Sequence, residues 1–172
     1  MPTPGEDKFL AFYDQYVTKI YRYIYFRVGS EFLAQDLTSE AFLKYWRHIS
    51  NNSENTLDNP RAFLYQIARN LLADFYRQKD KAPISLEEIT DKKIADKDLS
   101  LQEQTEQGLQ MDEIKKALTS LSEDYQEIII WRYLDELEIK EISTILEKSE
   151  GAVRVLISRA LSKLKEILAK VK

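Results

Sequence analysis

The segment from Ser149 to Leu164 carries the residues with the clearest chemistry in this sequence. It reads SEGAVRVLISRALSKL, a serine-glutamate-glycine opening followed by apolar residues at helical spacing. Arg154 and Arg159 lie off the apolar stripe, and an arginine fork can pair with a guanine edge or a phosphate. A serine in front of a helix caps it and leaves backbone amides directed at whatever anion lies ahead. The segment therefore predicts a helix that contacts nucleic acid, although a solvated surface helix fits the same pattern.

A shorter helix comes before this segment. Residues 139–146 carry apolar side chains at helical spacing, and only Glu147-Lys148-Ser149 separate them from the next helix. Helices joined so tightly cross at a steep angle, which is the helix-turn-helix arrangement. At about 100° per residue, the second helix turns Val153, Ile157, Ala160 and Leu164 inward. The candidate DNA contacts at its start and on its outward face are Ser149, Glu150, Gly151, Arg154, Val155, Ser158 and Arg159.

The charge of the chain is unevenly distributed. The net charge of the 172 residues is −4, but basic residues outnumber acidic ones after Ser149. Between Asp112 and Ser149 the balance is acidic, so the sequence has a basic tip on an acidic body. Phosphate neutralisation supplies most non-specific DNA affinity. We therefore expect weak DNA binding by the chain alone and a partner that supplies the rest.

The composition excludes several classes of chemistry. The chain has no cysteine and a single histidine, His48, which removes disulfides, thiol nucleophiles and cysteine-based metal sites. No carboxylates are paired in an apolar context, and no glycine-rich phosphate loop occurs. We therefore expect no catalytic residue, no metal and no cofactor. Without a membrane-spanning run or a signal pattern, we expect a cytoplasmic protein that is not an enzyme.

Hydrophobic periodicity predicts helices throughout and no strands, so we expect an all-α fold. Residues 9–28 repeat apolar and aromatic side chains up to Gly29-Ser30, and Asn59 with Pro60 starts another helix. The charged segment 82–108 has too few large apolar residues to hold a core, so it is interpreted as a linker. The predicted helices after the first are 31–49, 60–79, 111–121, 123–134, 139–146 and 151–171.

Two parts of the sequence resemble known regions of one protein family. The segment LSEDYQEIIIWRYLDELEIKEISTILEKSEGAVRVLISRALSKLKEIL resembles region 4 of bacterial RNA polymerase sigma factors. The segments DLTSEAFLKYWRHI and NPRAFLYQIARNLLADFYRQK resemble region 2 of the same sigma-70 family. Their order, with no additional domain between them, is similar to the extracytoplasmic function (ECF) type. The resemblance implies a region 2 domain at 1–81, a linker at 82–108 and a helix-turn-helix region 4 domain at 109–172.

The resemblance also implies a function. A sigma factor directs core RNA polymerase to promoters, reads the minus-thirty-five element with region 4, and reads and melts the minus-ten element with region 2. In the family an unstacked base is captured near the loop that is here Asn51–Asn59. The implied partners are core RNA polymerase and promoter DNA, both duplex and melted. We expect a monomer in the free state, whose linker lets the domains close on each other, and an anti-sigma protein as a candidate partner.

One face of the predicted helix 31–49 is the candidate polymerase-binding surface. Charged residues at helical spacing surround Leu43 there, and Trp46 borders them. A ladder of salt bridges around a core helix is the alternative, but exposed apolar residues suit a partner surface better. The resemblance assigns polymerase binding to Asp36, Leu37, Glu40, Leu43 and Trp46.

The predicted helix 60–79 combines an apolar stripe with a basic and aromatic face. Leu64, Ile67, Leu71 and Phe75 form the stripe. The other face suits single-stranded DNA, because rings stack on unpaired bases while arginines follow phosphates. Asp74 either orients an arginine or accepts from a cytosine amine, and a structural salt bridge is the preferred interpretation. The candidate minus-ten contacts are Arg61, Tyr65, Arg69, Asn70, Tyr76 and Arg77.

The sequence departs from the family pattern at two positions. Glu147 stands near the turn where the family often has glycine, and Leu156 stands where a basic residue is common. The loss of charge at Leu156 is expected to lower phosphate affinity. Two other functions fit parts of the sequence. They are a dimeric helix-turn-helix regulator that binds DNA without polymerase and a helical adaptor that binds only protein.

Overall fold

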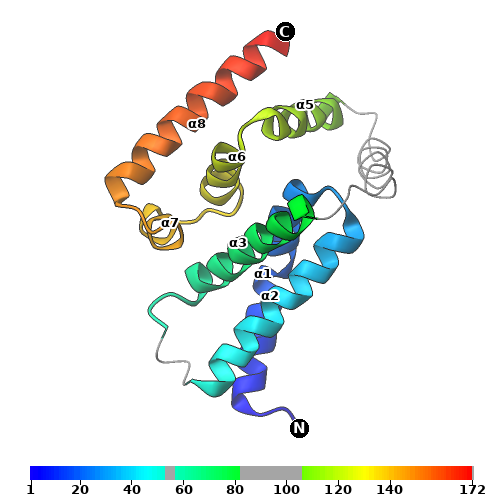
Figure 1. Cartoon of the computed structure of the whole chain (residues 1–172), viewed down its shortest axis with the longest axis vertical. Helices are drawn as coiled ribbons and strands as arrows, with labels where there is room; N and C mark the ends of the chain where they lie inside the picture. The colour runs from blue at the N-terminus through cyan, green and yellow to red at the C-terminus, as the bar shows by residue number, and fades with distance from the viewer. Residues whose placement is uncertain (53–56, 82–105, 172) are drawn as a thin grey trace. The chain divides into compact units, whose positions relative to one another are not determined.

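The computed structural model describes residues 1–52, 57–81 and 106–171 of the chain. All regular elements of these residues are helices, which confirms the prediction of an all-α fold (Figure 1). The chain divides into two compact units, Met1–Leu86 and Glu87–Lys172. Most of the predicted linker, residues 82–105, lies outside the described residues.

The first unit contains α1 (Pro4–Val28), α2 (Glu31–Asn51) and α3 (Pro60–Lys81). Each of these helices packs against the other two. The core between them combines aliphatic and aromatic side chains that are fully or almost fully buried. They include Ile20, Tyr23, Ile24, Ala41, Phe42, Tyr45, Leu64, Ala68 and Leu72.

Caps fix the boundaries between these helices, and the helix end at Gly29 and the Asn59 cap are as predicted from the sequence. Gly29 ends α1 with φ of 69°, a left-handed conformation that glycine adopts without strain. Ser30 begins α2, where its Oγ accepts a hydrogen bond from the Leu33 N–H at 3.3 Å. Asn59 precedes α3, and its Oδ1 accepts from the Ala62 N–H at 3.0 Å. The turns between helices therefore follow from local side-chain chemistry.

Helix α1 begins before the apolar run at residues 9–28 from which it is predicted. The helix begins at Pro4, because Thr3 and Glu6 form a capping box. The Glu6 N–H donates to Thr3 Oγ1 at 3.3 Å, and the Thr3 N–H donates to Glu6 Oε2 at 2.6 Å. These reciprocal bonds satisfy amides that the helix leaves unpaired. The sequence Thr-Pro-Gly-Glu therefore carries a helix start that apolar periodicity does not show.

The second unit contains α5 (Glu106–Ser120), α6 (Glu123–Ile129), η2 (Ile130–Leu134), α7 (Ile139–Leu146) and α8 (Glu150–Val171). Helix α8 contacts α5, α6 and α7. Figure 1 shows α7 beside the N-terminal end of α8, which continues well past it. The predicted helix 123–134 is α-helical only to Ile129 and continues as the π-helical segment η2, where the Asp135 N–H donates to the Ile130 carbonyl at 2.9 Å.

Two negative findings apply to the described residues. None of their helices has the length and apolar composition that crossing a membrane needs. The described histidine and carboxylate side chains also form no group of three or more that could hold a metal ion.

Glu147, in the turn between α7 and α8, has a strained backbone conformation. Glu147 ends α7 with φ of 55° and ψ of 42°, the left-handed conformation that glycine tolerates best. Its N–H and that of Lys148 both donate to the Ser143 carbonyl, Lys148 at 3.1 Å. The structure therefore places a glutamate in the conformation that a glycine near this turn would adopt without strain.

We predict that Glu147→Gly raises the free energy of unfolding of the second unit by about 1 kcal/mol, because it relieves the left-handed strain. In a Trp46→Phe background Trp131 is the only tryptophan, so its fluorescence in a urea titration reports this unit. Glu147→Ala is the matched control, since it removes the same charge but keeps a Cβ atom. Equal stabilisation by both substitutions would show that charge, not backbone strain, is responsible.

Candidate nucleic-acid interface

The N-terminus of α8 is capped by Ser149, as predicted. Its Oγ accepts from the Ala152 N–H at 3.1 Å, and its carbonyl accepts from the Val153 N–H at 3.0 Å. With α7 ending at Leu146, only three residues connect the two helices. This local geometry confirms the tight helix-turn-helix connection and fixes the direction in which α8 leaves the turn.

The inward side of α8 is the one that the sequence predicts. Val153 and Ala160 are fully buried and Ile157 is 9% exposed. Leu164 continues this stripe and is half-buried. These side chains pack where α8 contacts α5, α6 and α7. The burial fixes the rotation of α8 about its own axis.

The opposite side of α8 is exposed to solvent. The residue positions that the sequence marks as candidate DNA contacts are all exposed, and Leu156 is half-buried at the edge of this face. Val155 stands out, because its apolar side chain is 47% exposed among polar neighbours. The exposed residues are Ser149, Glu150, Gly151, Arg154, Val155, Ser158 and Arg159. We call this set the α8 face.

Arg154 is held loosely on the α8 face. Its Nη2 lies 3.5 Å from Glu150 Oε2, one turn earlier on the same helix. The two side chains are 60% and 47% exposed, and such solvated pairs contribute only about 0–1 kcal/mol. Arg154 can therefore exchange this carboxylate for a phosphate or a base edge at little cost.

The prediction that Tyr65 lies on the outward face of α3 is wrong. Tyr65 is fully buried, and its ring centroid lies 6.2 Å from that of Tyr23 on α1. Leu64 and Ala68 beside it are also fully buried. Because α3 packs against both α1 and α2, its buried arc is wider than one apolar stripe. Tyr65 is therefore a core residue and is removed from the candidate DNA contacts.

Tyr76 is partly committed to packing within the first unit. Its hydroxyl donates to the backbone carbonyl of Arg27 at the end of α1, and the Arg27 guanidinium lies 5.9 Å from the centre of its ring. The residue as a whole is half-buried. Tyr76 therefore connects α3 to α1 and is only partly exposed.

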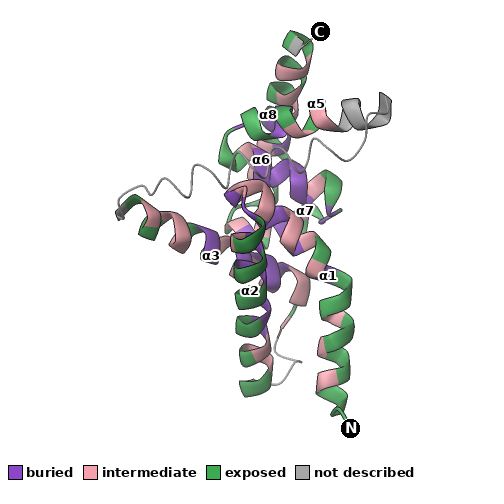
Figure 2. Cartoon of the chain, turned by 90° about the vertical axis from the view of Figure 1, so that its right-hand side faces the viewer, coloured by how far each residue is buried: buried purple, intermediate pink, exposed green. Residues whose placement is uncertain are grey.

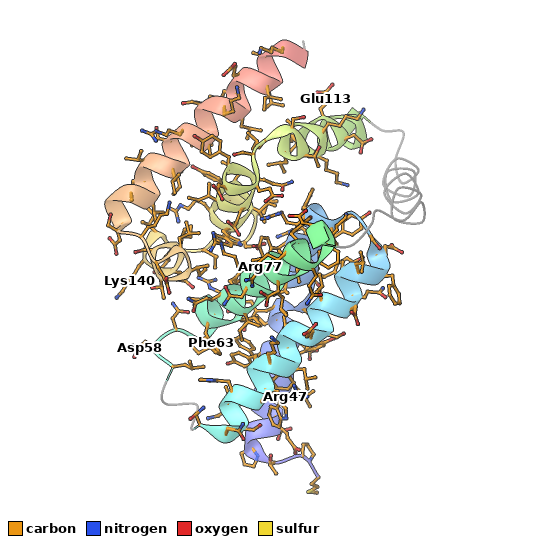
Figure 3. The ribbon with its side chains drawn as sticks, viewed as in Figure 1. Arg47, Asp58, Phe63, Arg77, Glu113 and Lys140 are labelled. Carbon is orange, nitrogen blue, oxygen red and sulfur yellow. The ribbon has the colours of Figure 1, made fainter. Side chains whose placement is uncertain are left out.

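The polar residues of α3 keep exposed positions to different degrees. Arg77, labelled on α3 in Figure 3, is 74% exposed and pairs with Asp74, which confirms the predicted salt bridge. Asn70 is exposed, whereas Arg61 and Arg69 are half-buried. Of the predicted minus-ten contacts on α3, those that stay accessible are therefore Arg61, Arg69, Asn70 and Arg77, with Tyr76 half-buried.

The loop before α3 is only partly described. Of the predicted base-capturing segment Asn51–Asn59, residues 53–56 lie outside the described residues. Phe63, which is not among the predicted contacts, lies near the start of α3 and is half-buried (Figure 3). Its ring centroid lies 4.6 Å from that of His48. The sequence does contain a signal for it, because an aromatic residue follows shortly after Asn59-Pro60 and the predicted base-capturing loop.

The outer face of α2 carries most of the candidate polymerase contacts. Asp36 and Glu40 are exposed, and Leu43 is 46% exposed. Figure 2 shows exposed positions along much of α2. Among the described residues, the charged side chains of this face at 36, 40, 44 and 47 form no ion pair with one another. The alternative of an intrahelical salt-bridge ladder is therefore not what the structure shows.

Leu37 and Trp46, the other two predicted polymerase contacts, are less exposed than a surface contact would be. Leu37 is only 7% exposed, so its prediction as a surface contact is wrong. It follows the buried Ala34 by one turn and belongs to the core side of α2. Trp46 is half-buried, with its ring centroid 4.9 Å from that of Phe9 on α1. The accessible surface is therefore centred on Asp36, Glu40 and Leu43, with Trp46 at its edge.

A groove of about 330 Å³ lies between α1 and α2 but does not suit nucleic acid. Its lining includes hydroxyl and apolar groups and no charged side chain, so it offers no cation to a phosphate. Burial raises the pKa of Tyr21, one of its lining residues, and the nearby charge of Glu31 raises that pKa further. The lining residues are Tyr13, Val17, Thr18, Tyr21, Gln35, Thr38 and Ser39.

Comparison with known proteins assigns both units. Residues 12–82 match the family model described as Sigma-70 region 2, and residues 111–164 match that described as Sigma-70, region 4. Over 161 residues the chain is 30% identical to the ECF RNA polymerase sigma factor SigM of Bacillus subtilis, which covers 90% of this chain and 91% of SigM. Over 163 residues it is 34% identical to the ECF RNA polymerase sigma factor BldN of Streptomyces coelicolor. That match covers 94% of this chain but only 61% of BldN.

A solved structure shows the same fold. The chain resembles the sigma factor RpoE from Bartonella quintana, crystallised in complex with the anti-sigma factor NepR, with a TM-score of 0.71. The likeness covers 94% of this chain and 97% of that one at 20% sequence identity.

The burial of Tyr65 in the core of the first unit can be tested by substitution. We predict that Tyr65→Ala lowers the free energy of unfolding of the first unit by about 3–5 kcal/mol, because it leaves a cavity in the core. Arg77→Ala, at the exposed end of the same helix, should change stability by less than about 0.5 kcal/mol. Urea unfolding followed by Trp46 fluorescence in a Trp131→Phe background measures both. A Tyr65→Ala variant as stable as the parent would place Tyr65 outside the core.

Proposed function

The chain belongs to the sigma-70 family of RNA polymerase sigma factors, of the ECF type, and we propose that it directs core RNA polymerase to specific promoters and opens the DNA there. The observation that carries this proposal is the presence of both region 2 and region 4 in one chain, in that order. A stand-alone helix-turn-helix regulator or a protein-binding adaptor would not account for both regions.

The second unit is proposed to bind the minus-thirty-five element in duplex form. The capped start of α8 presents backbone amides, and the α8 face presents Arg154 and Arg159 to solvent. A recognition helix reads base edges in the major groove with residues near its N-terminus. The α8 face has the polarity and position for that role, with α7 crossing at the turn.

The first unit is proposed to bind the melted minus-ten element. The accessible residues of α3 are mostly basic or amide side chains, among them Arg77, which is 74% exposed. Such a surface follows a phosphate backbone, while accessible ring surface stacks on unpaired bases. Tyr76 and Phe63, both half-buried, are the aromatic groups proposed to supply that stacking.

The outer face of α2 is proposed to dock on core RNA polymerase. Exposed Leu43 lies between exposed charged residues that are not paired with one another in the described structure. Apolar surface surrounded by charges is typical of a protein interface. Asp36, Glu40 and Leu43 are the proposed contacts, with Trp46 at the edge of the surface.

Further partners and properties follow from the same proposal. RpoE, which has the same fold, was crystallised with an anti-sigma factor, so we propose an anti-sigma protein as a partner of this chain too. We propose that the free chain is a monomer and acts in the cytoplasm, where promoters and polymerase meet. The role needs no cofactor and no catalytic group of its own, because the polymerase performs the chemistry.

The proposal is tested by transcription from a library of duplex promoters with purified core RNA polymerase, with and without the full chain. Promoter-specific transcripts that require both components would support it. Tight duplex binding by the chain alone, with no effect on initiation, would favour a stand-alone regulator instead.

We predict that the double variant Arg154→Gln/Arg159→Gln lowers the promoter affinity of the reconstituted holoenzyme about 10- to 100-fold and reduces its salt dependence. Lys170→Gln is the matched control, because Lys170 is on the same helix, 75% exposed and far from its N-terminus. Fluorescence anisotropy of labelled promoter duplexes across a salt series measures both. An unchanged affinity of the double variant would support the protein-binding adaptor.

We predict that Leu43→Ala weakens binding to core RNA polymerase about 5- to 10-fold, because it removes apolar surface from the proposed interface. Its effect on stability should be small, since the side chain is 46% exposed. Leu10→Ala on α1 is the matched control, with a side chain that is 51% exposed. Equal losses for the two variants, measured by competition for core polymerase, would mean that the surface is not confined to α2.

A further inference from the structure

Gly151 is exposed in the first turn of α8, and nothing in the described part of the chain requires glycine there. A Cβ atom built there would meet only Ser149 Oγ, at 4.0 Å, which is ordinary van der Waals contact. Gly151 is not among the residues with positive φ, so its backbone suits any side chain. Alanine would form the helix at least as well. Close approach of the α8 backbone to a bound partner is a reason that would explain glycine here.

Val155 is the second residue of the α8 face that the free protein does not explain. It lies one turn after Gly151 on the same side of the helix and is 47% exposed. Valine is a poorer helix former than alanine or the long polar residues, because its branched Cβ is restricted in a helix. Its methyl groups contribute little to the core while they face solvent. Relative to alanine, both the exposed valine and the glycine lower the stability of α8.

Together these two residues form a low apolar patch between longer side chains. Gly151 contributes no side chain, and Val155 contributes two methyl groups close to the helix axis. Arg154 and Arg159 on either side are exposed and can reach further out. A surface of this shape lets the backbone of α8 come close to a partner at Gly151 while the arginines contact groups at the edge.

The major groove of DNA offers one apolar group to such a patch, the C5-methyl group of thymine. We propose that Gly151 and Val155 form a binding site for a thymine methyl group in the upstream promoter element, in which Gly151 allows close approach and Val155 packs on the methyl. This inference rests on the proposed function, because it takes α8 to be the helix that enters the major groove. Under this proposal Val155 contributes to the preference of the protein for one promoter sequence over another.

The experiment uses holoenzyme reconstituted from core RNA polymerase and the full chain. Duplexes randomised over the upstream element are selected for binding, and the most enriched duplex is synthesised again with uracil in place of each thymine in turn. Uracil lacks only the C5-methyl group and keeps the hydrogen-bonding edges. The dissociation constant of each duplex is measured for the parent chain and for Val155→Ser.

We expect one uracil position to weaken binding by the parent about fourfold, the effect of losing one buried methyl group. The Val155→Ser variant should bind the thymine duplex about as weakly as the parent binds that uracil duplex, and it should be insensitive to the exchange. A uracil series without any effect on the parent would overturn the inference. So would a sensitivity that persists unchanged in Val155→Ser.

Gly151→Ala tests the close approach separately. The free chain should keep its thermal midpoint or gain about 1–3 °C, because alanine favours the helix. Promoter affinity should fall about tenfold or more, because the added methyl group separates the helix from the base. Gly5→Ala is the matched control, since Gly5 has the same position after the cap of α1 and open space around it. Unchanged promoter affinity in Gly151→Ala would contradict the role assigned to this glycine.

The outcomes separate this inference from the proposed function. Promoter binding that depends on Arg154 and Arg159 but not on any thymine methyl overturns the inference and leaves the sigma-factor function standing. Loss of polymerase affinity in Val155→Ser with a flat uracil series would place Val155 against protein and also overturn it. Failure of the holoenzyme to select any sequence would remove the proposed function, and the inference with it.

Discussion

The burial of one stripe of α8 determines where the candidate DNA contacts point. Val153, Ile157 and Ala160 are held against the preceding helices of the second unit. Since successive residues are about 100° apart around a helix, fixing these three fixes every other side chain of α8. A slip of one residue would bury part of the α8 face. The Ser149 cap then sets the starting point, so the direction of the arginines follows from packing and one hydrogen bond.

In the first unit, aromatic packing has the corresponding role for α2. The rings of Phe12 and Tyr45 are stacked with their centroids 4.5 Å apart, which joins α1 to α2. On the other side, the contact of His48 with Phe63 joins α2 to α3. Aromatic pairs of this kind contribute beyond the area they bury. With its inner side held from both neighbours, α2 can present a charged and apolar outer face that the core does not need.

The sequence predicts α8 well because its apolar residues form one narrow stripe, so the wheel leaves little choice between inside and outside. It predicts α3 less well, because that helix packs on two neighbours and its buried arc reaches Tyr65. Tyrosine suits both a core and a surface, so its residue type does not decide the matter. Leu37 shows a related problem, since the family pattern suggested a contact but the packing of α2 buries it. The apolar periodicity of residues 123–134 also does not distinguish the α-helical part from the π-helical segment η2 that follows Ile129.

The electrostatics of the α8 face bear on how the proposed sigma factor would choose its sites. Phosphate contacts attract a protein to any DNA, whereas base contacts distinguish one sequence from another. Here Glu150 lies beside Arg154, Leu156 stands where a basic residue is common in the family, and the chain is acidic overall. Each feature lowers the sequence-independent part of binding. Core polymerase would then supply the DNA affinity that the isolated chain lacks. The contacts of α8 would mainly discriminate between promoter sequences. A chain that binds DNA weakly by itself would therefore be selective within the holoenzyme.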